Sequence, residues 1–121
     1  MKNNEKALKI AVAECWHSQG SHDGITKYSK EVNNKWQFVE QSKIIELFSS
    51  CNGLMPIIER INKDNSQNSI EIFDYSVYCH CEKLTVVNGF NYVDTLLIEA
   101  LQDAILFYHD NQSMNCSNNK S

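Results

Sequence analysis

The chain is poor in proline, glycine and arginine. Its 121 residues include one proline, four glycines and eleven basic residues, of which only Arg60 is an arginine. The glycines fall in no G-x-G-x-x-G or G-K-[ST] context, so no loop of the nucleotide-phosphate type is predicted. Because arginine makes most bidentate contacts to phosphate, and because the net charge is −4, the composition disfavours nucleic acid as a partner. No cofactor is predicted either.

Long apolar runs are also missing. The uncharged stretch 48–58 contains serine, asparagine, glycine and proline, and is far shorter than the roughly 20 apolar residues that cross a bilayer. Lys9 and Glu14 interrupt the N-terminal segment, which therefore lacks the apolar core of a secretory signal. We expect a cytoplasmic protein without membrane association, and we interpret its five cysteines as reduced thiols.

The remaining composition is that of a globular domain. With 42% hydrophobic and 21% charged residues, the chain can bury a core of its own. Residues 5–110 are predicted to form a single domain. Residues 111–121 are polar and have almost nothing to bury, so this stretch is predicted to be a disordered tail.

Apolar residues at helical spacing indicate three helices. The patterns cover residues 5–18, residues 52–61 and residues 94–108. In the second pattern Pro56 is tolerable only in the first turn, which sets the expected start near Asn52. No internal repeat is visible in the sequence.

Strict alternation indicates strands in the second half of the chain. Residues 70–74 and 77–82 form a predicted antiparallel hairpin, and residues 84–87 add a third strand. Asn88-Gly89 suits a two-residue type I′ turn to a further strand over 90–93. We therefore predict an α+β fold with a small antiparallel sheet of about three strands, flanked by two to three helices.

Two parts of the first half resist assignment. Residues 20–34 show no sustained period and are predicted to form a long loop. In residues 35–48, Trp36 and Phe38 alternate as in a short strand, whereas the following apolar run is too brief to assign by periodicity. The secondary structure of 35–48 is left open.

Two segments carry a family resemblance: Leu54-Met-Pro-Ile-Ile-Glu-Arg-Ile61, and Leu97-Ile-Glu-Ala-Leu-Gln-Asp-Ala-Ile-Leu-Phe-Tyr108, which follows the strands. Over residues 46–110 the chain resembles small uncharacterised proteins of phages and integrated elements, whose fold is similar to the phage-type ABA sandwich. The resemblance implies a fold and a mobile-element setting. It implies no catalytic residue.

The cysteines are the first candidates for chemistry. Cys79 and Cys81 share one face of a strand and could reach one metal ion, but His80 points to the opposite face and no second cysteine pair follows. Cys51 lies near a helix start that would favour a thiolate, yet no motif supplies its base. We predict packing for the cysteine pair, no metal site and no catalytic residue. The alternative is a metal-binding or cysteine-dependent small enzyme.

Aromatic residues are the other candidates. Tyr78 and His80 lie on the strand face opposite the cysteines, which is either covered by a helix or open. If it is open, Tyr78, His80, Trp36 and His22 are predicted to bind a ligand or partner. The sequence thus favours a non-enzymatic binding protein of phage or mobile-element type that binds or sequesters a host protein or a small ligand. Edge strands leave room for a homo-oligomer.

Overall fold

The computed structural model describes residues 3–64, 68–81, 84–90 and 94–112. These form four helices and six strands, in the order α1 (Asn3–Ala13), β1 (His17–His22), β2 (Ile25–Val32), β3 (Lys35–Glu40), α2 (Gln41–Leu47), α3 (Cys51–Asp64), β4 (Asn68–Phe73), β5 (Ser76–Cys81), β6 (Leu84–Gly89) and α4 (Asp94–Gln112). None of the described helices is both long and apolar enough to cross a membrane.

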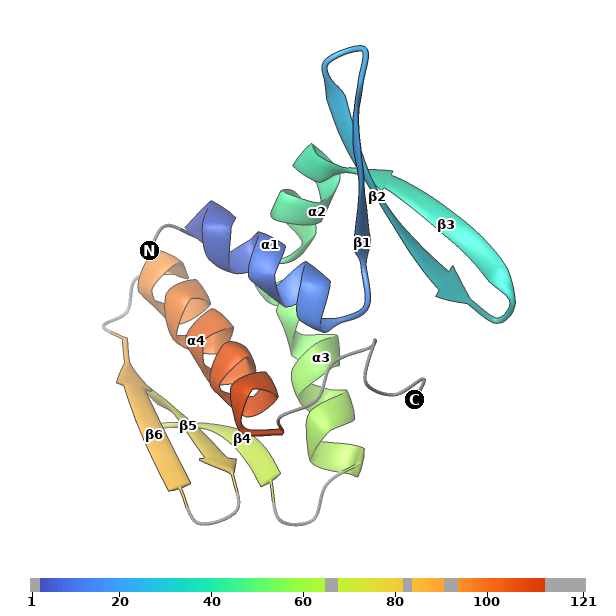
Figure 1. The fold of residues 1–121 in the computed structure, drawn as a ribbon. Helices are drawn as coiled ribbons and strands as arrows, with labels where there is room; N and C mark the ends of the chain where they lie inside the picture. The colour runs from blue at the N-terminus through green and yellow to red at the C-terminus, as the bar shows by residue number, and fades with distance from the viewer. Residues whose placement is uncertain (1–2, 65–67, 82–83, 91–93, 113–121) are drawn as a thin grey trace.

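The α+β class expected from the sequence is confirmed, with two three-stranded antiparallel sheets in place of one. The N-terminal sheet has the order β1-β2-β3 and the C-terminal sheet the order β4-β5-β6. Each sheet is preceded and followed by a helix, so the order helix, three strands, helix occurs twice along the chain. The sequence shows no corresponding repeat. Figure 1 shows the N-terminal sheet projecting from the helical body, whereas α4 lies along the C-terminal sheet.

Two-residue turns explain why so short a chain holds six strands. In three hairpins both central residues have positive φ, as a type I′ turn requires. These pairs are Asp23 (φ 55°) and Gly24 (φ 76°), Asn33 (54°) and Asn34 (66°), and Asp74 (50°) and Tyr75 (61°). The predicted loop over 20–34 is therefore wrong, because the Asp23-Gly24 turn joins β1 to β2.

Further boundaries also differ from the prediction. Residues 35–48, left open above, contain β3 and α2. Helix α1 ends at Ala13 rather than near residue 18, because Cys15 adopts φ 76° and turns the chain. Asn88 and Gly89 belong to β6 instead of a turn, and the strand predicted over 90–93 lies mainly outside the described residues. Helix α4 continues to Gln112, and the rest of the predicted tail lies outside them as well.

Helix α3 begins at Cys51, one residue before the predicted start. Pro56 is its sixth residue, and so lies beyond the first turn where we expected it. At the helix start the backbone passes very close to α2: a Cβ added at Gly53 would lie 1.7 Å from the carbonyl oxygen of Leu47. Only glycine fits this crossing without a backbone shift.

Helix α4 is the centre of the core. It packs on α1, α3 and the C-terminal sheet, and its Leu101 and Ile105 are fully buried. The sheet face toward α4 carries the buried Ile70, Val77 and Cys79. The C-terminal sheet therefore has one face on the body of the molecule, and the N-terminal sheet contacts α2 through β2 and β3.

Candidate functional site

The outward face of the N-terminal sheet carries two exposed aromatic residues. Trp36 and Phe38 stand two residues apart on β3, so they share a face. Trp36 is 54% exposed and Phe38 is 62% exposed. Aromatic side chains of this size are usually buried, and two of them side by side in solvent mark a candidate contact surface.

The opposite face of this sheet rests on the body of the protein. Tyr28 is buried there and is paired with the half-buried Val39. The ammonium group of Lys30 lies 5.8 Å from the ring centre of the buried Trp16, a distance at which a cation–π attraction operates. These contacts fix which face of β3 points outward.

Ser29 sits at the centre of the outward face. It is paired with His17 on one side and Phe38 on the other, and it is 1% exposed. The side-chain amide of Gln19 donates a hydrogen bond to the Ser29 hydroxyl. The centre of the face is thus covered, with one side-chain hydrogen bond at Ser29, and the exposed side chains of Trp36 and Phe38 lie on β3.

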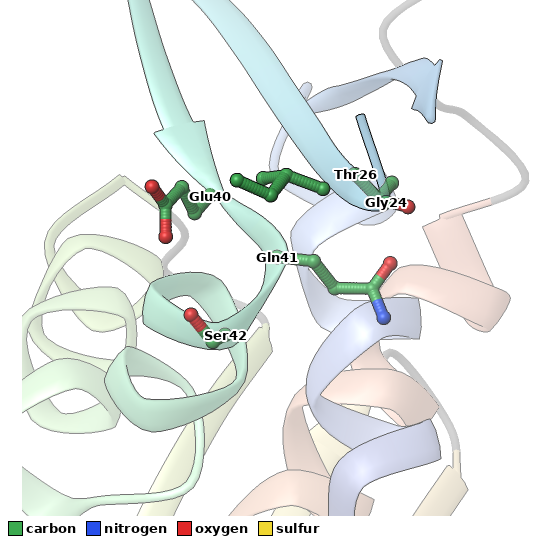
Figure 2. Close-up of a pocket in the computed structure, with 6 residues that line it drawn as sticks. Gly24, Thr26, Glu40, Gln41 and Ser42 are labelled. Carbon is green, nitrogen blue, oxygen red and sulfur yellow. The ribbon is translucent and has the colours of Figure 1, made fainter. Parts of the chain in front are cut away.

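A pocket of about 250 Å³ adjoins this face (Figure 2). It lies where the β1–β2 turn meets the start of α2, and is lined by Gly24, Ile25, Thr26, Glu40, Gln41 and Ser42. By strand alternation, Ile25 and Glu40 lie on the same face as Phe38. The pocket therefore offers a partly apolar recess with a carboxylate and an amide at its rim.

Tyr78 and His80 lie on a second open face, that of the C-terminal sheet. Their rings stack with centroids 6.0 Å apart and an interplanar angle of 4°. His80 Nδ1 lies 3.0 Å from the Thr85 hydroxyl, and His80 Nε2 lies 3.4 Å from a Glu71 carboxylate oxygen. Glu71 and Thr85 are exposed. This face is therefore open to solvent, which answers the question left by the sequence.

The structure does not bring the four predicted residues into one site. Trp36 belongs to the N-terminal sheet, whereas Tyr78 and His80 belong to the C-terminal sheet. His22 ends β1, and its side chain lies outside the described parts of the structure. Phe38 was missed as a site residue, although its period-two relation to Trp36 was visible in the sequence.

Cys79 and Cys81 lie on the inner face, where packing was predicted. They are 0% and 2% exposed, and their sulfur atoms are 3.3 Å apart. Burial, together with the neighbouring Cys81 thiol, raises the pKa of Cys79 far above its usual value. Such a thiol is a poor nucleophile. In the described part of the chain, no three His, Cys, Asp or Glu side chains are grouped as a metal site would need.

The other cysteines give a mixed outcome. Cys51 is a half-buried free thiol at the first residue of α3. Cys15 is disulfide-bonded. The interpretation of all five cysteines as reduced thiols is therefore wrong at Cys15, in a segment where the sequence gave no spacing from which a bridge could be inferred.

A buried charge cluster joins three helices. Glu14 lies just after α1, with its side chain only 4% exposed, and accepts hydrogen bonds from Arg60 on α3 and His109 on α4. The His109 Nε2 atom is 2.8 Å from the carboxylate. Burial favours a raised pKa for Glu14, but hydrogen bonds and charges from Arg60 and His109 outweigh it and lower the pKa to about 2. The cluster fastens the helices to one another.

Comparisons with models of known protein families, with curated proteins and with solved structures gave no match. The function of the chain must therefore be inferred from its own surfaces.

Proposed function

We propose that this protein is a non-enzymatic binding protein of phage or mobile-element type, and that it binds a host protein through the outward face of its N-terminal sheet. The observation that carries the proposal is the exposure of Trp36 and Phe38, 54% and 62%, on one face of an edge strand. Tryptophan and other aromatic side chains are enriched at the centres of protein interfaces, where they contribute much of the binding energy.

The shape of this surface favours a protein over a small molecule. Small-ligand sites are concave and typically enclose about 300–1,000 Å³. The recess beside Ile25 and Glu40 is smaller, about 250 Å³, and the two aromatic side chains stand next to it on an exposed sheet face. This arrangement suits a protein partner that covers the aromatic residues and places one of its own side chains in the recess.

The enzyme alternative has less support. A cysteine enzyme needs an accessible thiolate with a base at hydrogen-bond distance. Cys79 and Cys81 are buried, and the pKa of Cys79 is raised. No sequence motif supplies a base for Cys51. The cytoplasmic location stays a prediction from the sequence.

Purification of a complex tests the proposal. Tagged protein is incubated with lysate of the native host, and the captured species is then expressed and measured against the purified chain by calorimetry. The Phe38→Ala variant should weaken binding at least about tenfold, as expected for an interface anchor. Phe73→Ala is the matched control, because Phe73 is also a strand phenylalanine and is 68% exposed.

Two results would contradict the proposal. Equal loss of binding in Phe38→Ala and Phe73→Ala, or loss in neither, would remove the N-terminal sheet as the binding surface. Turnover of a metabolite that depends on Cys51 or His80 would instead support the enzyme alternative. Circular dichroism of each variant confirms that the fold is retained.

A further inference from the structure

We propose that the free edge of β3 pairs with β3 of a second copy of this chain. The two strands run antiparallel and are centred on Gln37, so that Trp36 of each copy lies opposite Phe38 of the other. This contact between two copies is distinct from the proposed host-protein interface and does not require it. In the described structure, the edge of β3 is the one strand edge that combines free backbone groups with two exposed aromatic side chains.

The outer edge of β3 is open in the part of the chain that the structure describes. Among the described strands β3 pairs only with β2, and in Figure 1 it lies at the outer margin of the projecting sheet. The opposite edge, β1, carries an irregularity between Ser18 and Ser21, a device that disrupts pairing with another strand. β3 pairs with β2 over all six residues without a bulge. Proteins usually protect such a regular edge with charges or a bulge, but β3 has charged residues only at its two ends, Lys35 and Glu40, and has its aromatic residues between them.

The register of the β2–β3 hairpin shows which backbone groups are free. Val32 and Lys35 flank the two-residue turn at Asn33-Asn34, and such a flanking pair exchanges both backbone hydrogen bonds. Alternate residues follow the same pattern, so Lys35, Gln37 and Val39 bond to β2. The backbone N–H and C=O groups that point away from β2 therefore belong to Trp36, Phe38 and Glu40. A new strand could form hydrogen bonds with these groups.

Symmetry limits the registers that two copies can adopt. Antiparallel strands related by a two-fold axis place residues of the same face opposite each other, so the axis must pass through a residue rather than between two. With the axis at Gln37, Trp36 lies opposite Phe38 twice. With the axis at Phe38, Phe38 lies opposite itself and Trp36 lies opposite Glu40, which gives one aromatic pair. With the axis at Trp36, Trp36 lies opposite itself and Phe38 lies opposite Asn34, which again gives one aromatic pair. Two aromatic pairs stabilise a sheet better than one, so the register centred on Gln37 is the one we propose.

The paired strands would make one six-stranded sheet from two copies. Trp36 and Phe38 of both copies would then lie together on its outward face, which removes part of their surface from water. Charges do not oppose this arrangement. β2 and β3 carry three lysines and two glutamates, and neither charged residue of β3, Lys35 or Glu40, lies opposite a like charge in this register.

Cysteine cross-linking tests the register on the full chain. Gln37 faces Gln37 of the other copy as a non-hydrogen-bonded pair with Cα atoms about 4.5 Å apart, a separation that a disulfide can bridge. Gln37→Cys should therefore give a covalent dimer under mild oxidation. Lys35→Cys is the control on the same strand and face, because its two copies would lie about 14 Å apart along the strands. Oxidation of the unsubstituted chain measures how much cross-linking comes from its own cysteines.

Sedimentation velocity tests the assembly itself. The wild-type chain should dimerise with increasing concentration. Phe38→Lys should raise the dimer Kd at least about tenfold, because the symmetric dimer contains two Trp36–Phe38 pairs and the substitution removes both. Phe73→Lys, at an equally exposed strand position of the other sheet, should leave the Kd unchanged. A wild-type chain that stays monomeric overturns the proposal. So does a dimer that Phe38→Lys retains, or one that cross-links better at Lys35→Cys than at Gln37→Cys.

Discussion

Arg60, the chain's single arginine, donates two hydrogen bonds to the buried carboxylate of Glu14, 46 residues before it in the sequence. The two residues bring the end of α1 against α3, and His109 adds α4 to the same carboxylate. This contact fixes three of the four helices at one point. The sheet that carries Trp36 follows directly after Glu14, so the cluster also positions the start of the candidate binding surface.

Replacement of Glu14 by glutamine should destabilise the protein by about 2–3 kcal/mol. Breaking a fully buried ion pair costs roughly 3–5 kcal/mol, and the effect is smaller here because Arg60 is half exposed and can regain water. Urea unfolding followed by circular dichroism measures the change. Glu59→Gln is the control on α3, because Glu59 is exposed; it should stay within about 0.5 kcal/mol of wild type. Equal effects of the two substitutions would contradict the role of the cluster.

Acid should remove the stability that Glu14 contributes. Its pKa is about 2 in the folded chain against an ordinary value of 4.5, so the unfolded chain binds more protons between these two values. The contribution is therefore complete above about pH 4.5 and is lost as the pH falls toward 2, with a total on the order of 3 kcal/mol. Urea midpoints of wild type and Glu14→Gln should converge over this range. Parallel curves would show that Glu14 does not carry the effect.

Alanine at Gly53 should destabilise the chain by about 2 kcal/mol or more. Alanine favours a helix over glycine by up to about 1 kcal/mol, but its Cβ would lie 1.7 Å from the Leu47 carbonyl oxygen. Since backbone atoms occupy that space, α2 and α3 must move apart. Asn52→Ala, at an exposed position of the same helix, measures the helix preference without the clash. A Gly53→Ala variant as stable as Asn52→Ala would contradict this prediction, because it would show that α2 and α3 can move apart without loss of stability.

The sequence was informative where local patterns decide the structure. The stripe over 94–108 identified α4, and alternation identified β4 and β5 because each strand there has one buried face. β1 was missed because its residues, His-Ser-Gln-Gly-Ser-His, include no apolar side chain. That strand is held by backbone pairing to β2 and by a tight turn, and neither leaves a hydrophobic period in the sequence.

The candidate site was predictable only in part, for the same reason. Strand alternation placed Tyr78 and His80 on one face, and the structure agrees. Whether Trp36 joins them depends on how the two sheets are placed by the helices, which no local pattern encodes. The contact between Glu14 and Arg60 likewise depends on tertiary packing. Charged residues are mostly exposed in proteins, so the sequence gives no indication that these two form a buried pair.

The two tryptophans should report on the binding surface separately. Trp16 is 8% exposed in the core, whereas Trp36 is 54% exposed on β3. Trp36→Phe should leave a blue-shifted emission that acrylamide quenches weakly, and Trp16→Phe should leave a red-shifted emission that it quenches strongly, because quenching follows access to solvent. In the Trp16→Phe variant, emission should also shift to the blue as a partner or a second copy covers Trp36. Trp16 is part of the core, so circular dichroism must first show that this variant is folded. A folded variant whose Trp36 is shielded at low concentration would contradict the exposed aromatic face on which both proposals depend.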